Sequence, residues 1–252
     1  MSKLIIALIG FIFVMCMNCP TALMERNDIM VDLTELEDYI YNHVVPIASS
    51  WNDQDAYAVS FFVYANGAYI YKGKENVTEL SIGYVTEQDC EHAPLLSEDR
   101  WNLPPIMHNI PIFQPNNISP TVPVLVDDGM AFLFDWYARN GIKAIGQESN
   151  ETQYDEHMNY IGKGPVGYWE VLTAASRVAR RLQEEGFIQN AFGKPLPIIV
   201  HEYEIYGLIR EATEYANPHG EAAEFLKYYD ISVEEANEIL SQYLQQRERK
   251  GN

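Results

Sequence analysis

The sequence predicts one α+β domain with a mainly antiparallel sheet that begins in an N-terminal hairpin, is covered by helices, and continues into a helical C-terminal region. Three observations lead to this prediction. β-Rich runs gather between residues 56 and 87, the most regular amphipathic pattern lies at 168–186, and helical patterns fill 205–249. Early strands followed by late helices are typical of α+β folds. Residues 30–252 are long enough to bury one sizeable core.

Residues 1–23 are predicted to be a signal peptide or a membrane anchor. The uncharged run LIIALIGFIFVMCM is short for a membrane span but typical of the apolar part of a signal peptide. NCPTALMER is a poor cleavage site, so an uncleaved anchor stays open, as does translation from Met24 or Met30. We expect an exported protein, periplasmic or membrane-anchored, or a cytoplasmic one if translation starts at either methionine.

The first helix and strands of the domain follow the leader. A helix is expected from Asp32, an N-cap with Glu35 three residues on, up to Pro46. AYAVSFFVYANGAYIYKG predicts two antiparallel strands joined at Asn66-Gly67, a dipeptide that tolerates the positive φ angles of a tight turn. Residues 79–87 predict a third strand beside them.

Seven prolines between residues 94 and 123 predict an insertion or long loop at about 94–125. Proline lacks the N–H that helices and central strands need. Residues 126–142 have helical periodicity and end at Asn140-Gly141. Their acidic start at Asp127-Asp128-Gly129 is interpreted as a first helical turn, because the spaced oxygens of a calcium loop are missing.

The C-terminal half predicts a helix, a strand and two or three further helices. GYWEVLTAASRVARRLQEEGF carries one apolar stripe, and Gly186 suits the position after its last turn. An apolar strand is expected at 196–203. The later helices are separated at Asn217-Pro218, and the last begins at Ser232 as an N-cap, with Glu235 three residues later.

The chain is strongly acidic, with 36 acidic and 17 basic residues and a formal net charge of −19. The resulting potential repels nucleic-acid phosphates and anionic lipid, so we expect no nucleic-acid partner and membrane contact only through the N-terminal segment. The same charge suits a basic protein partner, a cation or simple solubility. Of the three cysteines, only Cys90 lies outside the leader, and the sequence contains no zinc-binding motif. We therefore expect no metal and no cofactor.

The run His201-Glu202-Tyr203-Glu204 is the candidate site. A histidine and two carboxylates can bind a partner, ligate a metal or transfer a proton. On a strand, however, His201 and Tyr203 face one side while Glu202 and Glu204 face the other. The prediction is therefore a binding role for His201, Glu202 and Glu204, with no catalytic residue assigned. A polar strand end without a function stays the simpler interpretation.

Three stretches resemble a bacterial family called domain of unknown function 4303. They are WNDQDAYAVSFFVYANG, LQEEGFIQNAFGKPLPIIVHEYE and ATEYANPHGEAAEFLKYY, within a span from about Asp32 to Asp230. The leader, the proline-rich segment and the last helix exceed the family pattern, and Glu202 and Glu204 stand where aspartates are expected. Small acidic α+β proteins of this kind are similar to immunity or antitoxin-type inhibitors, which implies a protein partner.

The function expected from the sequence is therefore that of a non-catalytic acidic binding protein, such as an immunity-type inhibitor of a secreted, basic toxin. One alternative is a hydrolase or metal-dependent enzyme that uses His201, Glu202 and Glu204. A second alternative is an envelope-associated protein without a toxin partner.

Overall fold

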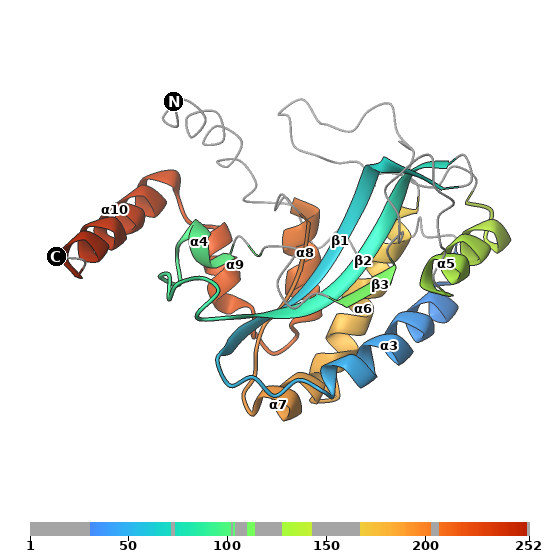
Figure 1. The fold of residues 1–252 in the computed structure, drawn as a ribbon, viewed down its shortest axis with the longest axis horizontal. Helices are drawn as coiled ribbons and strands as arrows, with labels where there is room; N and C mark the ends of the chain where they lie inside the picture. Colours follow the sequence, from blue (N-terminus) through green and yellow to red (C-terminus); the bar gives the residue numbers. More distant parts are fainter. Residues whose placement is uncertain are drawn as a thin grey trace.

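The computed structural model describes residues 31–71, 74–101, 103, 110–113, 128–142, 167–202 and 207–250. One sheet in the order β3-β2-β1-β4 is packed with helices (Figure 1), so the predicted α+β class is confirmed. The strands are β1 (Ala56–Tyr71), β2 (Lys74–Thr86), β3 (Ile110–Phe113) and β4 (Ile198–His201). The helices are α3 (Thr34–Ala48), α4 (Glu98–Trp101), α5 (Asp128–Arg139), α6 (Tyr168–Glu184), α7 (Phe187–Phe192), α8 (Gly207–Ala216), α9 (Ala223–Tyr229) and α10 (Val233–Lys250).

The hairpin of β1 and β2 is longer than predicted. Asn66 does not turn the chain but pairs with Val77 inside the ladder, and the turn lies between Tyr71 and Lys74. The predicted turn at Asn66-Gly67 and the separate third strand at 79–87 were therefore wrong. Burial explains the choice of register, because residues 78–80 and most of 82–86 are buried opposite the apolar start of β1, whereas residues 72–76 are mostly polar. A register shift after Asn66 accommodates the glycine.

The two faces of the sheet bury different sets of side chains. Val59, Phe61 and Val63 of β1 belong to the larger core cluster, which contains the apolar residues of α3 and α6. Alanines of α6, such as Ala175, let this helix approach the sheet closely, and the predicted helix at 168–186 is confirmed. Ala58 belongs to the smaller cluster on the other face, together with Tyr57, Val85, Cys90, Trp101, Ile199 and Phe225.

Two side chains hydrogen-bond to the backbone at the outer edge of β4. They are Thr213 in α8 and Asn217, the residue after α8. Asn217 accepts the N–H of Ile198 at 2.9 Å and donates to its carbonyl at 2.7 Å. Thr213 accepts the N–H of Val200 and donates to its carbonyl, both at 3.1 Å. Gln183 of α6 donates to Asn217 Oδ1 at 2.9 Å. These buried bonds replace a neighbouring strand and attach α6 and α8 to the sheet.

The ends of α5 and α6 and the start of α10 agree with the predictions from the sequence. Gly141 and Gly186 adopt positive φ just after α5 and α6, as expected for residues that end helices. The hydroxyl of Ser232 accepts the N–H of Glu235 at 3.2 Å at the start of α10. α3 differs, because it continues past Pro46 to Ala48. Pro46 lacks the N–H that would donate to the carbonyl of Asn42, and the helix ends two residues later.

The proline-rich segment contains secondary structure that the sequence did not predict. α4 forms within it, and β3 adds to the edge of the sheet beside β2. Pro111 is tolerated in β3 because an edge strand has one side without a ladder. The interpretation as a long loop was therefore wrong for 98–101 and 110–113. Residues 104–109 and 114–125 lie outside the described residues.

The N-terminal prediction falls outside the described residues, because the leader at 1–23, Met24 and Met30 precede them. In the part of the chain that the structure describes, no helix is long and apolar enough to cross a membrane. Export, anchoring and the start site therefore stay predictions.

We expect Asn217→Ala to lower the free energy of unfolding by about 3 kcal/mol, because it leaves several buried partners unpaired, including both backbone groups of Ile198. The matched control Asn190→Ala removes an exposed amide from α7 and should change stability by less than about 0.5 kcal/mol. Urea unfolding followed by circular dichroism measures both. Equal losses for the two variants would contradict the role of Asn217 at the edge of β4.

Candidate functional site

His201 is the last residue of β4 and is only 2% exposed. Its Nε2 lies 2.8 Å from the hydroxyl of Ser60, and its Nδ1 lies 3.3 Å from the carbonyl oxygen of Glu202. The ring also packs against Phe62, with ring centroids 5.5 Å apart. Burial lowers the pKa of His201 to about 4, so the imidazole is neutral at pH 7.

The bond between Ser60 and His201 was not visible in the sequence, because 141 positions separate the two residues. A neutral imidazole that accepts from a serine hydroxyl and donates its other N–H to an oxygen is also the arrangement of a serine nucleophile and its base. Ser60 is 1% exposed, however, so a substrate cannot reach its hydroxyl in this conformation. The hydrogen bond satisfies two buried polar groups of the sheet.

The two carboxylates of the predicted site are not placed on one strand. β4 ends at His201, so the half-buried Glu202 already lies beyond it, and the predicted strand at 196–203 is confirmed only for 198–201. Glu204 lies outside the described residues. Among the residues that the structure describes, no group of three or more His, Cys, Asp and Glu side chains could hold a metal ion. The binding role of His201, Glu202 and Glu204 stays a prediction.

The structure builds a second cluster around Arg100, which the sequence analysis missed. The guanidinium of Arg100 donates to both carboxylate oxygens of Glu87, at 2.6 and 2.8 Å, and to the carbonyl of Ala93 at 3.2 Å. It also stacks 4.2 Å from the ring centre of Tyr57, whose hydroxyl donates to the carbonyl of Arg100. The bond from Arg100 holds the pKa of Glu87 below its usual range.

A sequence signal for this cluster does exist. Arg100 is the single lysine or arginine in the acidic stretch 87–100, which contains five carboxylates. A lone cation among several anions is expected to pair with one of them. The sequence could not show that the pair is formed with Glu87, nor that the side chain of Arg100 is only 7% exposed.

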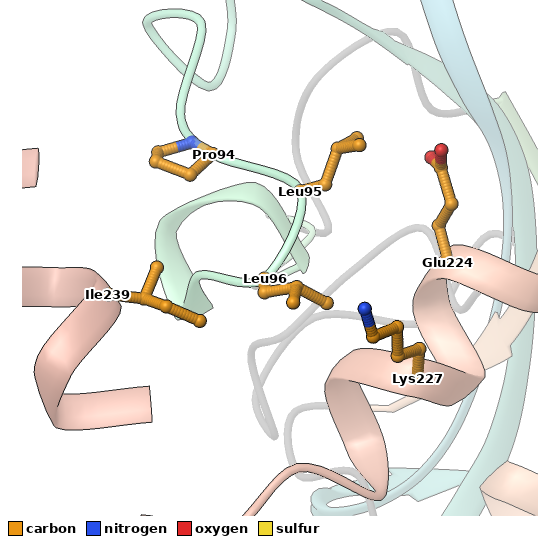
Figure 2. Close-up of a pocket in the computed structure, with 6 residues that line it drawn as sticks. All are labelled: Pro94, Leu95, Leu96, Glu224, Lys227 and Ile239. Carbon is orange, nitrogen blue, oxygen red and sulfur yellow. The ribbon is translucent and has the colours of Figure 1, made fainter. Parts of the chain in front are cut away.

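The Arg100 pair fixes a turn that presents apolar side chains to solvent. Leu95, in this turn, is 43% exposed, which is unusual for a large apolar side chain among the described residues. The turn, α9 and α10 enclose a hollow of about 390 Å³, here called the α9–α10 groove. It is lined by Pro94, Leu95, Leu96, Glu224, Lys227 and Ile239. Figure 2 shows Leu96 between Ile239 of α10 and Lys227 of α9.

Two charged residues of opposite sign, Glu224 and Lys227, line the α9–α10 groove. Glu224 lines it opposite Leu95, and Glu98 and Asp99 follow the turn directly. Burial raises the pKa of Tyr228 in α9 to about 12, and the charges of Glu98 and Asp99 add to this effect. The negative charges of α4 therefore act on a side chain of α9. Apart from Glu224, exposed carboxylates of α4 and α10 are Glu98, Asp99, Glu234, Glu235 and Glu238.

No family model matches this chain, and no curated protein and no solved structure matches it either. The resemblance to domain of unknown function 4303 stays a prediction, and so do the protein partner and the place of action.

The pKa of His201 predicts a pH dependence of stability. Folding lowers this pKa from 6.5 to about 4, so the unfolded chain binds more protons between these values. The contribution is fully present above pH 6.5 and is lost as the pH falls toward 4. We expect wild-type protein to lose about 2 kcal/mol of unfolding free energy between pH 7 and pH 5 from this group alone.

His201→Gln should remove this part of the slope, whereas His219→Gln, at an exposed histidine, should keep it. Urea titrations at pH 7, 6 and 5 measure the difference between the variants. If His201→Gln and wild type lose the same stability over this range, the imidazole is not buried in its neutral form.

Proposed function

We propose that the protein is a non-catalytic binding module that captures a basic partner protein at the α9–α10 groove. The observation that carries the proposal is an apolar wall, formed by the exposed Leu95 and the half-buried Leu96, with the exposed carboxylate of Glu224 at the same groove. Apolar anchors surrounded by charged groups are the usual anatomy of a protein interface. A cationic segment with one apolar side chain would match this chemistry.

Charge supports a basic partner over an acidic or neutral one. The chain carries a formal net charge of −19, and the exposed carboxylates of α4 and α9, Glu98, Asp99 and Glu224, outnumber Lys227. An extended negative field accelerates the encounter with a basic protein and repels acidic competitors. Inhibition of a basic secreted toxin is the specific form of this proposal, and it agrees with the export that the leader predicts.

The burial of Ser60 and His201 is a further reason to prefer binding over hydrolysis. The hydroxyl of Ser60 and the Nε2 of His201 satisfy each other inside the sheet, and both residues are at most 2% exposed. A hydrolase needs its nucleophile within reach of the substrate. A partner at the α9–α10 groove can bind without reaching Ser60 or His201.

The groove is tested with two matched substitutions of exposed apolar residues. Leu95 is 43% exposed at the groove, and Ile110 is 40% exposed on β3 in the sheet. A photo-reactive residue at position 95 first captures and identifies the partner in cells of the source organism. Binding of the purified partner is then measured by surface plasmon resonance. We expect Leu95→Glu to weaken binding at least about tenfold and Ile110→Glu to leave it unchanged.

The two charged residues of the groove should change the association rate of the same partner in opposite directions. Glu224→Lys should slow association about two- to fivefold and Lys227→Glu should accelerate it, with smaller effects at high ionic strength. Equal effects of Leu95→Glu and Ile110→Glu would remove the groove from the interface. Conversion of a substrate that disappears in His201→Gln would instead support the hydrolase hypothesis.

A further inference from the structure

Three successive carbonyl groups at the turn, those of residues 93–95, accept hydrogen bonds from side chains that follow in the sequence. The donors, in the order of the carbonyls, are Arg100 at 3.2 Å, Ser97 at 2.8 Å and Trp101 at 2.6 Å. Each donor residue is at most 6% exposed, so water has little access to these bonds. The backbone of the turn is thereby held from its buried side, while Leu95 remains 43% exposed.

Trp101 connects two walls of the α9–α10 groove. Its ring packs edge-on against Phe225 of α9, with ring centroids 5.5 Å apart, and against Tyr57 of β1 at 5.9 Å. Its Nε1 donates to the carbonyl of Leu95 in the turn. Glu224, the residue before Phe225, lines the groove opposite Leu95 (Figure 2). One side chain therefore holds both the turn and α9, and it fixes how far apart they lie.

This arrangement keeps an apolar side chain exposed in the absence of a partner. In a turn that is free to move, Leu95 would gain free energy by rotating inward, because burial of apolar surface is favourable. The bond from Trp101 ties the carbonyl of Leu95 to the buried side and leaves its side chain toward solvent. A partner then meets a wall that is already formed, and it does not have to order the turn on binding.

We propose that Trp101 is the positioning residue of the groove: its ring fixes α9, its N–H fixes the turn, and the groove is formed before the partner arrives. This role deepens the proposed binding function and rests on it for the identity of the site. Trp101 does not itself line the groove, so it acts on a partner through Leu95 and α9. If the groove is formed in only a fraction of the molecules, the apparent affinity falls by that fraction.

Trp101→Phe tests the positioning role, because it keeps an aromatic ring and removes the N–H that bonds to the turn. The matched control is Trp169→Phe: Trp169 is also buried, at 4% exposed, but its Nε1 has no hydrogen-bond partner among the described residues. Hydrogen exchange of the free protein reports on the turn through the N–H of Ser97, which donates to the carbonyl of Pro94 at 3.1 Å. We expect Trp101→Phe to accelerate exchange in residues 93–97 about tenfold and Trp169→Phe less than about twofold. Unchanged exchange of the turn in Trp101→Phe would overturn the positioning role, with or without a known partner.

Binding kinetics of the partner captured at position 95 test whether the groove is formed before binding. Surface plasmon resonance, at a temperature where all variants are folded, separates association from dissociation. We expect Trp101→Phe to slow association about five- to tenfold and to change dissociation less than about twofold, because the same contacts form once the turn is ordered. Trp169→Phe should keep both rates, since a variant that is only less stable still presents a formed groove. Faster dissociation with unchanged association in Trp101→Phe would indicate a lost contact and would overturn the positioning role.

The two measurements separate the positioning role from the proposed function. If no partner is captured at position 95, the proposed function fails, and the exchange result alone decides whether Trp101 positions the turn. If a partner binds at the groove but associates equally fast with Trp101→Phe and wild type, the proposed function holds and the preformed groove is wrong. Where Trp101→Phe does not fold, Ser97→Ala removes the bond to the carbonyl of Pro94 and is expected to change exchange and association in the same direction.

Discussion

The outer edge of β4 is the constraint on which most of the other elements depend. A parallel strand of four residues at the end of a sheet leaves backbone N–H and C=O groups without a neighbouring strand, and buried groups of this kind are costly when unpaired. Asn217 and Thr213 pair with them, and Gln183 holds Asn217 in place. This network fixes α8 against the sheet, and α8 is followed directly by α9 and the groove.

A second interaction positions the opposite wall of the groove. Arg100 and Glu87 form a two-bond ion pair in which the side chain of Arg100 is 7% exposed, and Tyr57 of β1 stacks against the guanidinium. Removal of either charged partner would leave the other charge poorly solvated, which is more costly than the pair is stabilising. The turn at residues 94–96 is thereby attached to the hairpin, although it has no regular secondary structure of its own.

The groove and α10 together suggest how an acidic chain of this size divides its surface. The sheet and α6 supply stability, whereas the apolar residues that line the groove lie on the turn and α10. Ile239 of α10 belongs to the groove. Stability and recognition then depend on different residues, so substitutions at the groove can change binding without unfolding the core.

Local signals in the sequence determined the α+β class, the helix at 168–186, the glycines that end α5 and α6, and the cap of α10. Each depends on residues within a turn or two of one another. Tertiary structure alone decided the register of the hairpin, the pairing of His201 with Ser60, the ion pair of Arg100 and the groove. The register was decided by which segments could be buried opposite each other. His201 meets a residue 141 positions away, and its burial depends on packing from several elements, which periodicity cannot show.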